Sequence, residues 1–437
     1  MRPDVHLQDD RRQLIDRRTL LARGVGLAAL IASGCTRGEP RGFAGDALRQ
    51  LRGRLERHVE PSFAPGVVGL LARGSVVETF VLGRLAFNGG ADMRRDTIFR
   101  IASMTKAITA TAVMMLIEDG KVGLDEPVDR LLPELADRRV LRRLDAEVDD
   151  TVPAKRPLRV ADLLTYRCGL GMIVAPPGRY PIQKAIADLG INGVGFGPPD
   201  PALPLNGDRW MQKISSLPLF AQPGEDWFYT AGSNIQGVLV ERASGQPLSR
   251  FFEERIFGPL AMKDTAFFVP PNKIDRLAHP YRTQNGALVV SDEPTTGKFS
   301  RPPAFEQGDA GLVSTVDDYL AFARMLLADG RHRGQSLLTP ASVEAMTTNH
   351  LTAAQRAGGE IILRGRGWGY GMSVVTDTVA GQPAVGSFGW NGGYGTSWIS
   401  DPSRDLTMIL LTQHEFSSPS GDPIHQEFQS DTYRALG

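Results

Sequence analysis

Cysteine is scarce in this sequence, with only Cys35 and Cys168 among 437 residues. The two lie in such different sequence contexts that a disulfide between them is not expected, and two cysteines are too few for a disulfide-built scaffold. A chain of this length can bury enough apolar surface for two domains, or for one large domain with an insertion. Burial of a hydrophobic core must therefore stabilise the fold.

An excess of charge of either sign is also missing. Basic and acidic side chains number 49 each, and residues 1–34 hold six of the basic and four of the acidic ones, which leaves −2 for the remainder. Proteins that bind nucleic acids usually carry clustered positive charge. The composition therefore gives no electrostatic case for a nucleic-acid partner.

Long hydrophobic runs are absent as well. The apolar stretch at residues 25–31 is too short to span a bilayer as a mature helix, although an amphipathic opening helix is an alternative. An Arg-Arg pair at 17–18 precedes this stretch and Ala-Ser-Gly-Cys at 32–35 follows it, which is the plan of a twin-arginine signal with a lipoprotein-like cleavage site. The pattern predicts a signal segment over 1–34, a polar linker over 35–45, and an exported protein that is periplasmic or anchored in the membrane. Cys35 is the lipidation candidate for that tether, but Ala32 is a weak residue for the first lipobox position, so cleavage there stays open.

Several catalytic motifs are missing. The sequence has no Gly-x-Ser-x-Gly elbow, no His-Glu-x-x-His and no phosphate-binding glycine loop. Its seven histidines show no metal-ligand spacing. We therefore expect no metal site and no cofactor.

The hydrophobic pattern places strands at both ends of the chain and helices between them. Helical spacing covers residues 46–60 and 103–118, the second of which predicts an amphipathic helix that ends at Gly120. Strand-like runs cover 67–71, 76–82, 371–376, 396–400 and 406–412. This order predicts one sheet assembled from distant segments, in a sheet domain over 46–160 and 306–437, with a mainly helical insertion lobe over 161–305.

Ser103 and Lys106 are the first candidates for chemistry. Residues at positions i and i+3 share a face of a helix, so the hydroxyl and the amine can come within hydrogen-bond reach. A lysine that burial has made neutral can take the proton of a serine hydroxyl and so activate it as a nucleophile. In isolation the same pattern fits a serine that caps a helix. It is, however, the only Ser-x-x-Lys match at any of the eight lysines.

The surroundings of this pair resemble the serine β-lactamase and penicillin-binding superfamily, and most closely the class C β-lactamase-related esterases called family VIII carboxylesterases. The resemblance runs from about residue 46 to the C-terminus. It implies a β-lactamase-like α+β fold, with an antiparallel sheet flanked by helices and the active site in a groove beside a mainly helical second lobe. The segments that carry it are 99–107, 119–128, 162–165, 169–170, 223–224, 237–245, 311–315 and 389–393.

The same resemblance assigns roles to other residues. Tyr229 would be the general base for acylation and would return the proton to the leaving oxygen, with help from the nearby ammonium of Lys106. The backbone amides of Ser103 and Gly393 would form an oxyanion hole. Packing in the core is the alternative for Tyr229, and a glycine-rich turn is the alternative for the segment around Gly393.

Two positions depart from the β-lactamase pattern. The segment Trp390, Asn391 and Gly392 stands where β-lactamases have Lys-Thr-Gly, and Ala231 stands where they have the asparagine of Tyr-x-Asn. Both changes remove groups that would hold a β-lactam but leave the acylation machinery. These four positions are our candidates for substrate binding.

The sequence therefore predicts a serine hydrolase that forms an acyl-enzyme at Ser103 and hydrolyses small carboxylic esters, with residues 171–222 lining the groove. A first alternative is an enzyme of the same fold that cleaves amides: a β-lactamase, a D-amino-acid peptidase or an amidase. A second is a non-catalytic binding protein tethered to the envelope. Cys168 is expected to be a small buried thiol.

Overall fold

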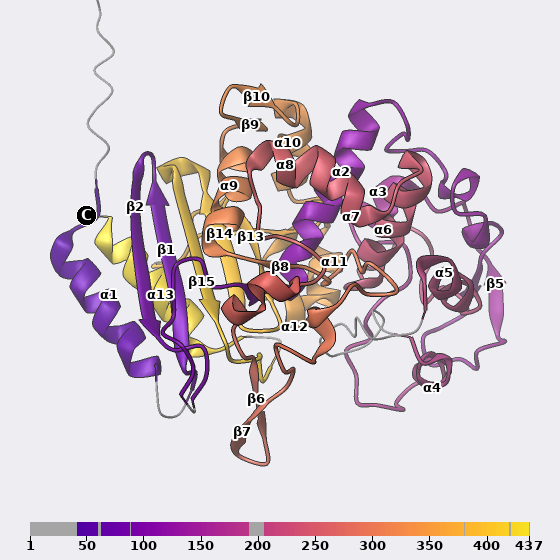
Figure 1. The fold of residues 1–437 in the computed structure, drawn as a ribbon. Helices are drawn as coiled ribbons and strands as arrows, with labels where there is room; N and C mark the ends of the chain where they lie inside the picture. The colour runs from indigo at the N-terminus through magenta and orange to yellow at the C-terminus, as the bar shows by residue number, and fades with distance from the viewer. Residues whose placement is uncertain are drawn as a thin grey trace, which may run out of the picture. The chain divides into compact units, whose positions relative to one another are not determined.

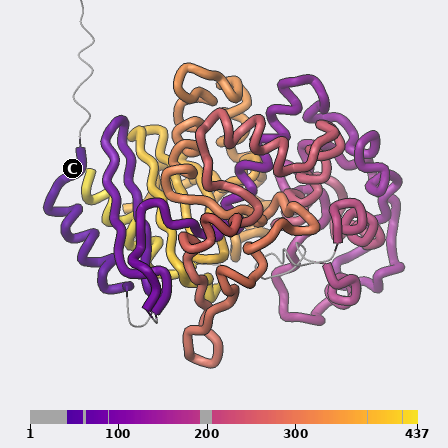
Figure 2. Tube along the Cα trace, in the orientation of Figure 1, coloured from indigo at the N-terminus to yellow at the C-terminus, as the bar shows by residue number. Residues whose placement is uncertain are grey.

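The main sheet brings the two ends of the chain together. A computed structural model describes residues 42–59, 63–87, 89–191, 205–379, 381–418 and 421–436. The sheet has seven antiparallel strands in the order β11-β12-β13-β14-β15-β1-β2, so the hairpin from the start of the chain pairs with strands from its end (Figures 1 and 2). Its strands are β1 (Gly66–Arg73), β2 (Val76–Gly83), β11 (Gly367–Trp368), β12 (Ser373–Val374), β13 (Phe388–Gly392), β14 (Thr396–Asp401) and β15 (Leu406–Thr412).

Helices occupy much of the remaining chain. They are α1 (Gly45–His58), α2 (Thr105–Glu118), α3 (Val160–Leu164), α4 (Pro181–Leu189), α5 (Gly207–Ser215), α6 (Ala231–Ser244), α7 (Leu248–Phe252), α8 (Gly258–Leu260), α9 (Val316–Leu327), α10 (Pro340–Thr347), α11 (Ala353–Gly358), α12 (Glu360–Leu363) and α13 (Pro423–Ala435). Short antiparallel pairs join β3 (Phe99–Arg100) to β8 (Val313–Ser314), β4 (Arg139–Leu141) to β5 (Thr151–Pro153), β6 (Tyr281–Gln284) to β7 (Ala287–Val290), and β9 (Arg331–His332) to β10 (Gln335–Ser336).

Alternation along the strands divides the core into two layers. Val67 and Leu71 of β1 point to the face that α1 and α13 cover, where Phe428 of α13 joins them. Val68 and Leu70 point to the opposite face, whose core also holds α2 and α9 (Figure 1). Helices thus cover both faces of an antiparallel sheet, which confirms the α+β, β-lactamase-like fold.

Helix α2 differs from the predicted amphipathic helix. Every residue from Thr105 to Leu116 is buried, so the helix runs through the core and has no solvated face along this length. Its threonines are accommodated because their hydroxyls donate to backbone carbonyls: Thr109 to Gly308 and Thr111 to Ala107. The sequence pattern locates the helix correctly but not its degree of burial.

The other predicted helices and strands form, but their first and last residues differ from the predicted ones. The hairpin and the last two strands form as predicted, whereas the predicted strand over 371–376 is reduced to the two residues of β12. Helices α3 to α8 lie within residues 161–305 or at their edge, but the division into a sheet domain and an insertion lobe stays a prediction.

The predictions for the N-terminus fall outside the described residues. The signal segment over 1–34, Cys35 and most of the linker over 35–45 belong to this part of the chain. Across the described residues, no helix combines the length and the apolarity that crossing a membrane would need.

Candidate active site

Ser103 lies at a sharp turn between β3 and α2. Ala102 has a φ of 40° and begins the short helical turn η1 (Ala102–Met104), which leads directly into α2. A residue other than glycine in this region is strained, and such strain often accompanies functional sites. The turn packs against β13 and places Ser103 on the lining of a pocket.

Lys106 follows one turn later and is fully buried. Its Nζ lies 3.0 Å from Ser103 Oγ, 2.7 Å from the carbonyl oxygen of Asp309 and 3.9 Å from Asp309 Oδ2. Burial lowers the pKa of Lys106 to about 8, although the Asp309 carboxylate opposes this shift. A substantial fraction of the amine is therefore neutral near pH 8, and the 3.0 Å contact lets it accept the proton of Ser103.

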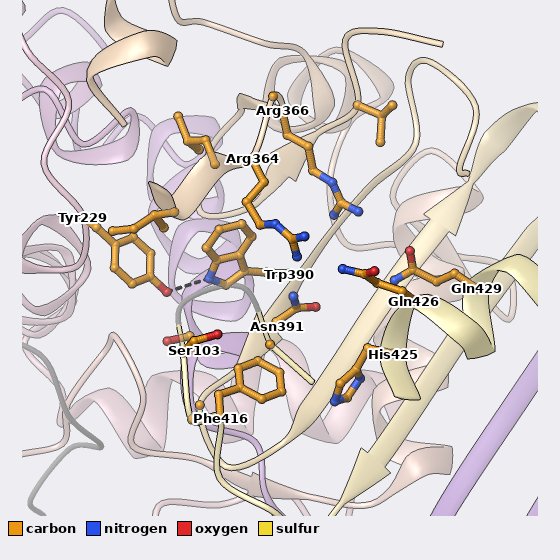
Figure 3. Close-up of a pocket in the computed structure, with 18 of the residues that line it drawn as sticks. Ser103, Tyr229, Arg364, Arg366, Trp390, Asn391, Phe416, His425, Gln426 and Gln429 are labelled. Carbon is orange, nitrogen blue, oxygen red and sulfur yellow. Dashed lines mark hydrogen bonds between the residues drawn. The ribbon is translucent and has the colours of Figure 1, made fainter. Parts of the chain in front are cut away.

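Tyr229 completes the group. Lys106 Nζ lies 4.7 Å from the centre of its ring, and the indole Nε1 of Trp390 donates a 2.6 Å hydrogen bond to its Oη (Figure 3). Burial raises the pKa of the phenol, while hydrogen bonds to Ser103 and Trp390 act in the opposite direction because they favour the phenolate. The structure thus brings together the hydroxyl, amine and phenol that the sequence analysis singled out.

The backbone around Tyr229 is tightly held. Met172 N donates to Tyr229 O at 2.8 Å, and a side chain at Gly171, whose φ is 153°, would collide with that same carbonyl oxygen. The next residue, Thr230, has a φ of 84° and donates from Oγ1 to Asp309 Oδ2 at 2.7 Å. These contacts fix the position of the phenol beside Ser103.

Asp309 is a site residue that the sequence analysis missed. It joins Thr230 to Lys106, and its backbone N–H donates to the buried side chain of Asn234 at 3.1 Å. No sequence motif links position 309 to Lys106, since the two are brought together only by the tertiary fold.

The predicted oxyanion donors both reach the pocket lining. The carbonyl of Gly392 accepts a hydrogen bond from Gly395 N, so the Gly393 N–H of the same planar peptide points away from Gly395. A Cβ built on Gly393 would meet nothing within 4 Å, which leaves room for an acyl group above this backbone. Ser103 lies on the same lining. Their role as oxyanion donors stays a prediction.

The four predicted substrate-binding positions divide into two pairs. Trp390 and Asn391 line the pocket. Gly392 does not, because its Cα packs against the carbonyl oxygen of Ile101, where any Cβ would collide. Ala231 does not line it either, since it is completely buried at the start of α6. Substrate binding by the four residues stays a prediction, and only the first pair lies on the pocket lining.

The pocket has a volume of about 750 Å³ and extends from Ser103 toward the first turns of α13 (Figure 3). Among the described residues of the predicted lining, 171–191 and 205–222, only Met172 contacts it. Of the lining that the described residues make up, segments from the last part of the chain form most. They contribute residues 362–366, 375–377, 379, 382–383, 415–418, 421, 425–426 and 429.

The comparisons with known proteins decide the family. Residues 54–427 match the Beta-lactamase family. The chain belongs to the Beta-lactamase family. It is 36% identical to Protein Rv1367c of Mycobacterium tuberculosis, over 84% of this chain and 93% of that protein. It is 30% identical to Esterase EstB of Burkholderia gladioli, over 88% of this chain and 95% of that protein.

A solved structure shows the same fold. EstCE1, a hydrolase with promiscuous acyltransferase activity, superposes with a TM-score of 0.71 at 24% identity, over 89% of this chain and 99% of that one. The resemblance to β-lactamase-related proteins is thereby confirmed. The chain is a member of a family of serine hydrolases with the β-lactamase fold.

In this member of the Beta-lactamase family, Trp390 stands where the Lys-Thr-Gly pattern has a lysine, and the two side chains differ chemically. A lysine at this position would bring a second ammonium, whereas the indole brings one neutral donor that is already used by Tyr229. It also brings aromatic surface, because Trp390 packs at 4.8 Å between ring centres against Trp368. The site near Ser103 is therefore less positively charged than a Lys-Thr-Gly site.

Proposed function

We propose that this protein is a carboxylesterase that forms an acyl-enzyme at Ser103 and hydrolyses small carboxylic esters. The contact between Ser103 Oγ and the buried amine of Lys106 carries the proposal, because it joins a nucleophile to a base whose pKa lies near neutrality. In the first step the hydroxyl attacks the ester carbonyl and its proton passes to the Lys106–Tyr229 pair. The alcohol then leaves with a proton from Tyr229, and water hydrolyses the acyl-enzyme.

Apolar side chains on and beside the pocket lining favour apolar acyl or alcohol groups. Among the described residues, the exposed large hydrophobic side chains are Val174, Ile361, Val379 and Val385, at 39–58% exposure. Val379 lines the pocket, and each of the others lies within two residues of one that does. An exposed apolar side chain on the lining, such as Val379, suits the apolar part of a substrate. Similarity to Esterase EstB supports the same assignment.

A panel of para-nitrophenyl esters with short acyl chains, compared with a chromogenic cephalosporin, tests the proposal. We expect rapid ester turnover, little cephalosporin turnover, and a mass increase on Ser103 equal to the acyl group when the intact protein is measured during turnover. Rapid cephalosporin turnover without ester turnover would instead favour the β-lactamase alternative. Failure of a fluorophosphonate to label Ser103 would favour a non-catalytic binding protein.

Trp390→Phe is expected to lower kcat/KM for these esters by roughly 10- to 100-fold, since a hydrogen bond to a developing phenolate contributes about 1.5–3 kcal/mol. The control is Trp368→Phe, because Trp368 stacks in the same cluster but its Nε1 has no partner among the described residues. Steady-state kinetics of both variants check the prediction. Equal losses in the two variants would show that Trp390 acts through packing alone.

A further inference from the structure

The end of the pocket far from Tyr229 is polar. Figure 3 shows Arg364 and Arg366 on one wall, with Gln426 and Gln429 of α13 on the side toward which their guanidinium groups point. Asn391 lies between this end and Ser103 (Figure 3). The site thus combines a nucleophile at one end with a group of nitrogen donors at the other.

Arg366 is a partly buried cation that has no counter-charge among the described residues. No described residue forms a hydrogen bond or an ion pair with its side chain. Burial and the neighbouring charge of Arg364 lower the pKa of Arg366 to about 10. Partial burial of an unpaired guanidinium costs free energy, and an anion bound beside it would recover that cost.

The acidic side chains among the described pocket residues do not neutralise Arg366, because each is engaged elsewhere. Asp377 lies 3.3 Å from Arg356, and Asp309 accepts from Thr230 beside Lys106. Glu415 accepts a short hydrogen bond from Ser291, and burial raises the pKa of its carboxyl, which favours the neutral form. A surplus of positive charge therefore remains at the Arg366 end.

Two amides next to this charge are also unused. The side chains of Asn391 and Gln429 line the pocket and have no hydrogen-bond partner among the described residues. Gln426, in contrast, accepts from both terminal nitrogens of Arg364, at 2.9 and 3.3 Å, once its amide is oriented to suit them. Arg364 is thereby held in place, while Arg366, Gln429 and Asn391 have donors available for a ligand.

We infer that the polar end is an anion subsite, and that the preferred substrates are esters with a carboxylate remote from the scissile bond, held by Arg366 with Gln429 and Asn391. This inference rests on the proposed esterase function and narrows its substrate class. Arg366 supplies the charge, and the guanidinium geometry suits a carboxylate because two parallel N–H groups can donate to its two oxygens.

Two matched pairs of esters test the inference. In the first pair the alcohol part differs: the butyrate ester of para-hydroxybenzoate against that of para-hydroxybenzamide. In the second the acyl part differs: the para-nitrophenyl monoester of adipic acid against the same ester of adipic acid monoamide. We expect kcat/KM for the anionic member of at least one pair to exceed that of the neutral member by roughly 10- to 100-fold.

Arg366→Gln should reduce the ratio of kcat/KM between the anionic and the neutral ester to about one. Arg366→Lys should restore part of this ratio, because lysine returns the charge but not the planar guanidinium with its parallel N–H groups. The control is Arg255→Gln, which removes an ion pair with Asp119 outside the pocket lining and should leave the ratio unchanged. Ratios near one in the wild type for both pairs, or a ratio that survives Arg366→Gln, would overturn the anion subsite.

Binding to the inactive enzyme separates this inference from the esterase proposal. Calorimetric titration of Ser103→Ala with the two butyrate esters and with the monomethyl ester of adipic acid and the methyl ester of adipic acid monoamide measures recognition without turnover. We expect the anionic ligand of at least one pair to bind roughly 10-fold or more tightly than its neutral partner, and Arg366→Gln in the same background to abolish this difference. Equal affinities would refute the subsite, whereas selective binding in a protein that hydrolyses no ester would refute only the esterase.

Discussion

Ser103→Ala is expected to lower kcat/KM for esters by about 10⁴-fold or more, because no acyl-enzyme can form without the hydroxyl. Binding of substrate should persist, since the pocket wall and its aromatic cluster are unchanged. Intact-mass measurement during turnover should show no acyl adduct, and a fluorophosphonate should no longer label the protein. Ser103 is only partly buried, so loss of its oxygen should leave the melting temperature close to that of the wild type.

The matched control is Ser75→Ala, in the exposed turn between β1 and β2. It removes the same atom at a position with no lysine beside it, so labelling and turnover should stay at the wild-type level. Adduct formation that persists in Ser103→Ala would move the nucleophile to another residue and end the proposed mechanism. Loss of activity together with a large fall in melting temperature in both variants would mean that the assay reports folding.

The sequence predicts the parts of the site that are close together in the chain. Ser103 and Lys106 are three residues apart on one helix, so their contact follows from helical geometry alone. The β1–β2 hairpin and the strands β14 and β15 follow from local alternation for a similar reason. Tyr229 was placed beside Ser103 only through the family resemblance, because no local rule spans the more than one hundred intervening residues.

The parts that escaped prediction depend on tertiary packing. The sequence analysis treated Trp390 as a substrate contact, whereas its indole donates a hydrogen bond to Tyr229. Asp309 and Arg366 carry no motif, and their importance comes from burial among particular neighbours. The pocket wall was assigned to residues 171–222, but among the described residues the last part of the chain forms most of it, because the turn that holds Ser103 packs against β13 and the segments after β15 line the same pocket.

Lys106→Met is expected to lower kcat/KM for esters by roughly 10²- to 10⁴-fold, the range for loss of a general base. In the wild type the rate of acylation should rise as the pH increases through about 8, since the neutral amine accumulates above the lowered pKa of Lys106. The variant should lose this rise. A pH profile of kcat/KM for both proteins, with the exposed Lys121→Met as control, checks the prediction.

The same substitution should not destabilise the protein at pH 7. The pKa of Lys106 falls from 10.5 to about 8 on folding, so the unfolded chain holds a proton between these values that the folded chain has lost. The free energy of unfolding therefore increases between pH 8 and 10.5. Below pH 8 the buried amine is charged, and its burial lowers the free energy of unfolding by an amount on the order of 3 kcal/mol.

Methionine has a similar length and no charge, so Lys106→Met removes the cost of burying the ammonium. The substitution also takes away the cation that lies 3.9 Å from the Asp309 carboxylate, and this loss offsets part of the gain. We expect a melting temperature at pH 7 equal to or above that of the wild type, with the difference shrinking toward pH 10.5. A marked destabilisation at pH 7 would show that the ammonium stabilises the site through Asp309 more than its burial costs. Lys106 would then be held in its charged form, and Tyr229 alone would have to take the proton of Ser103.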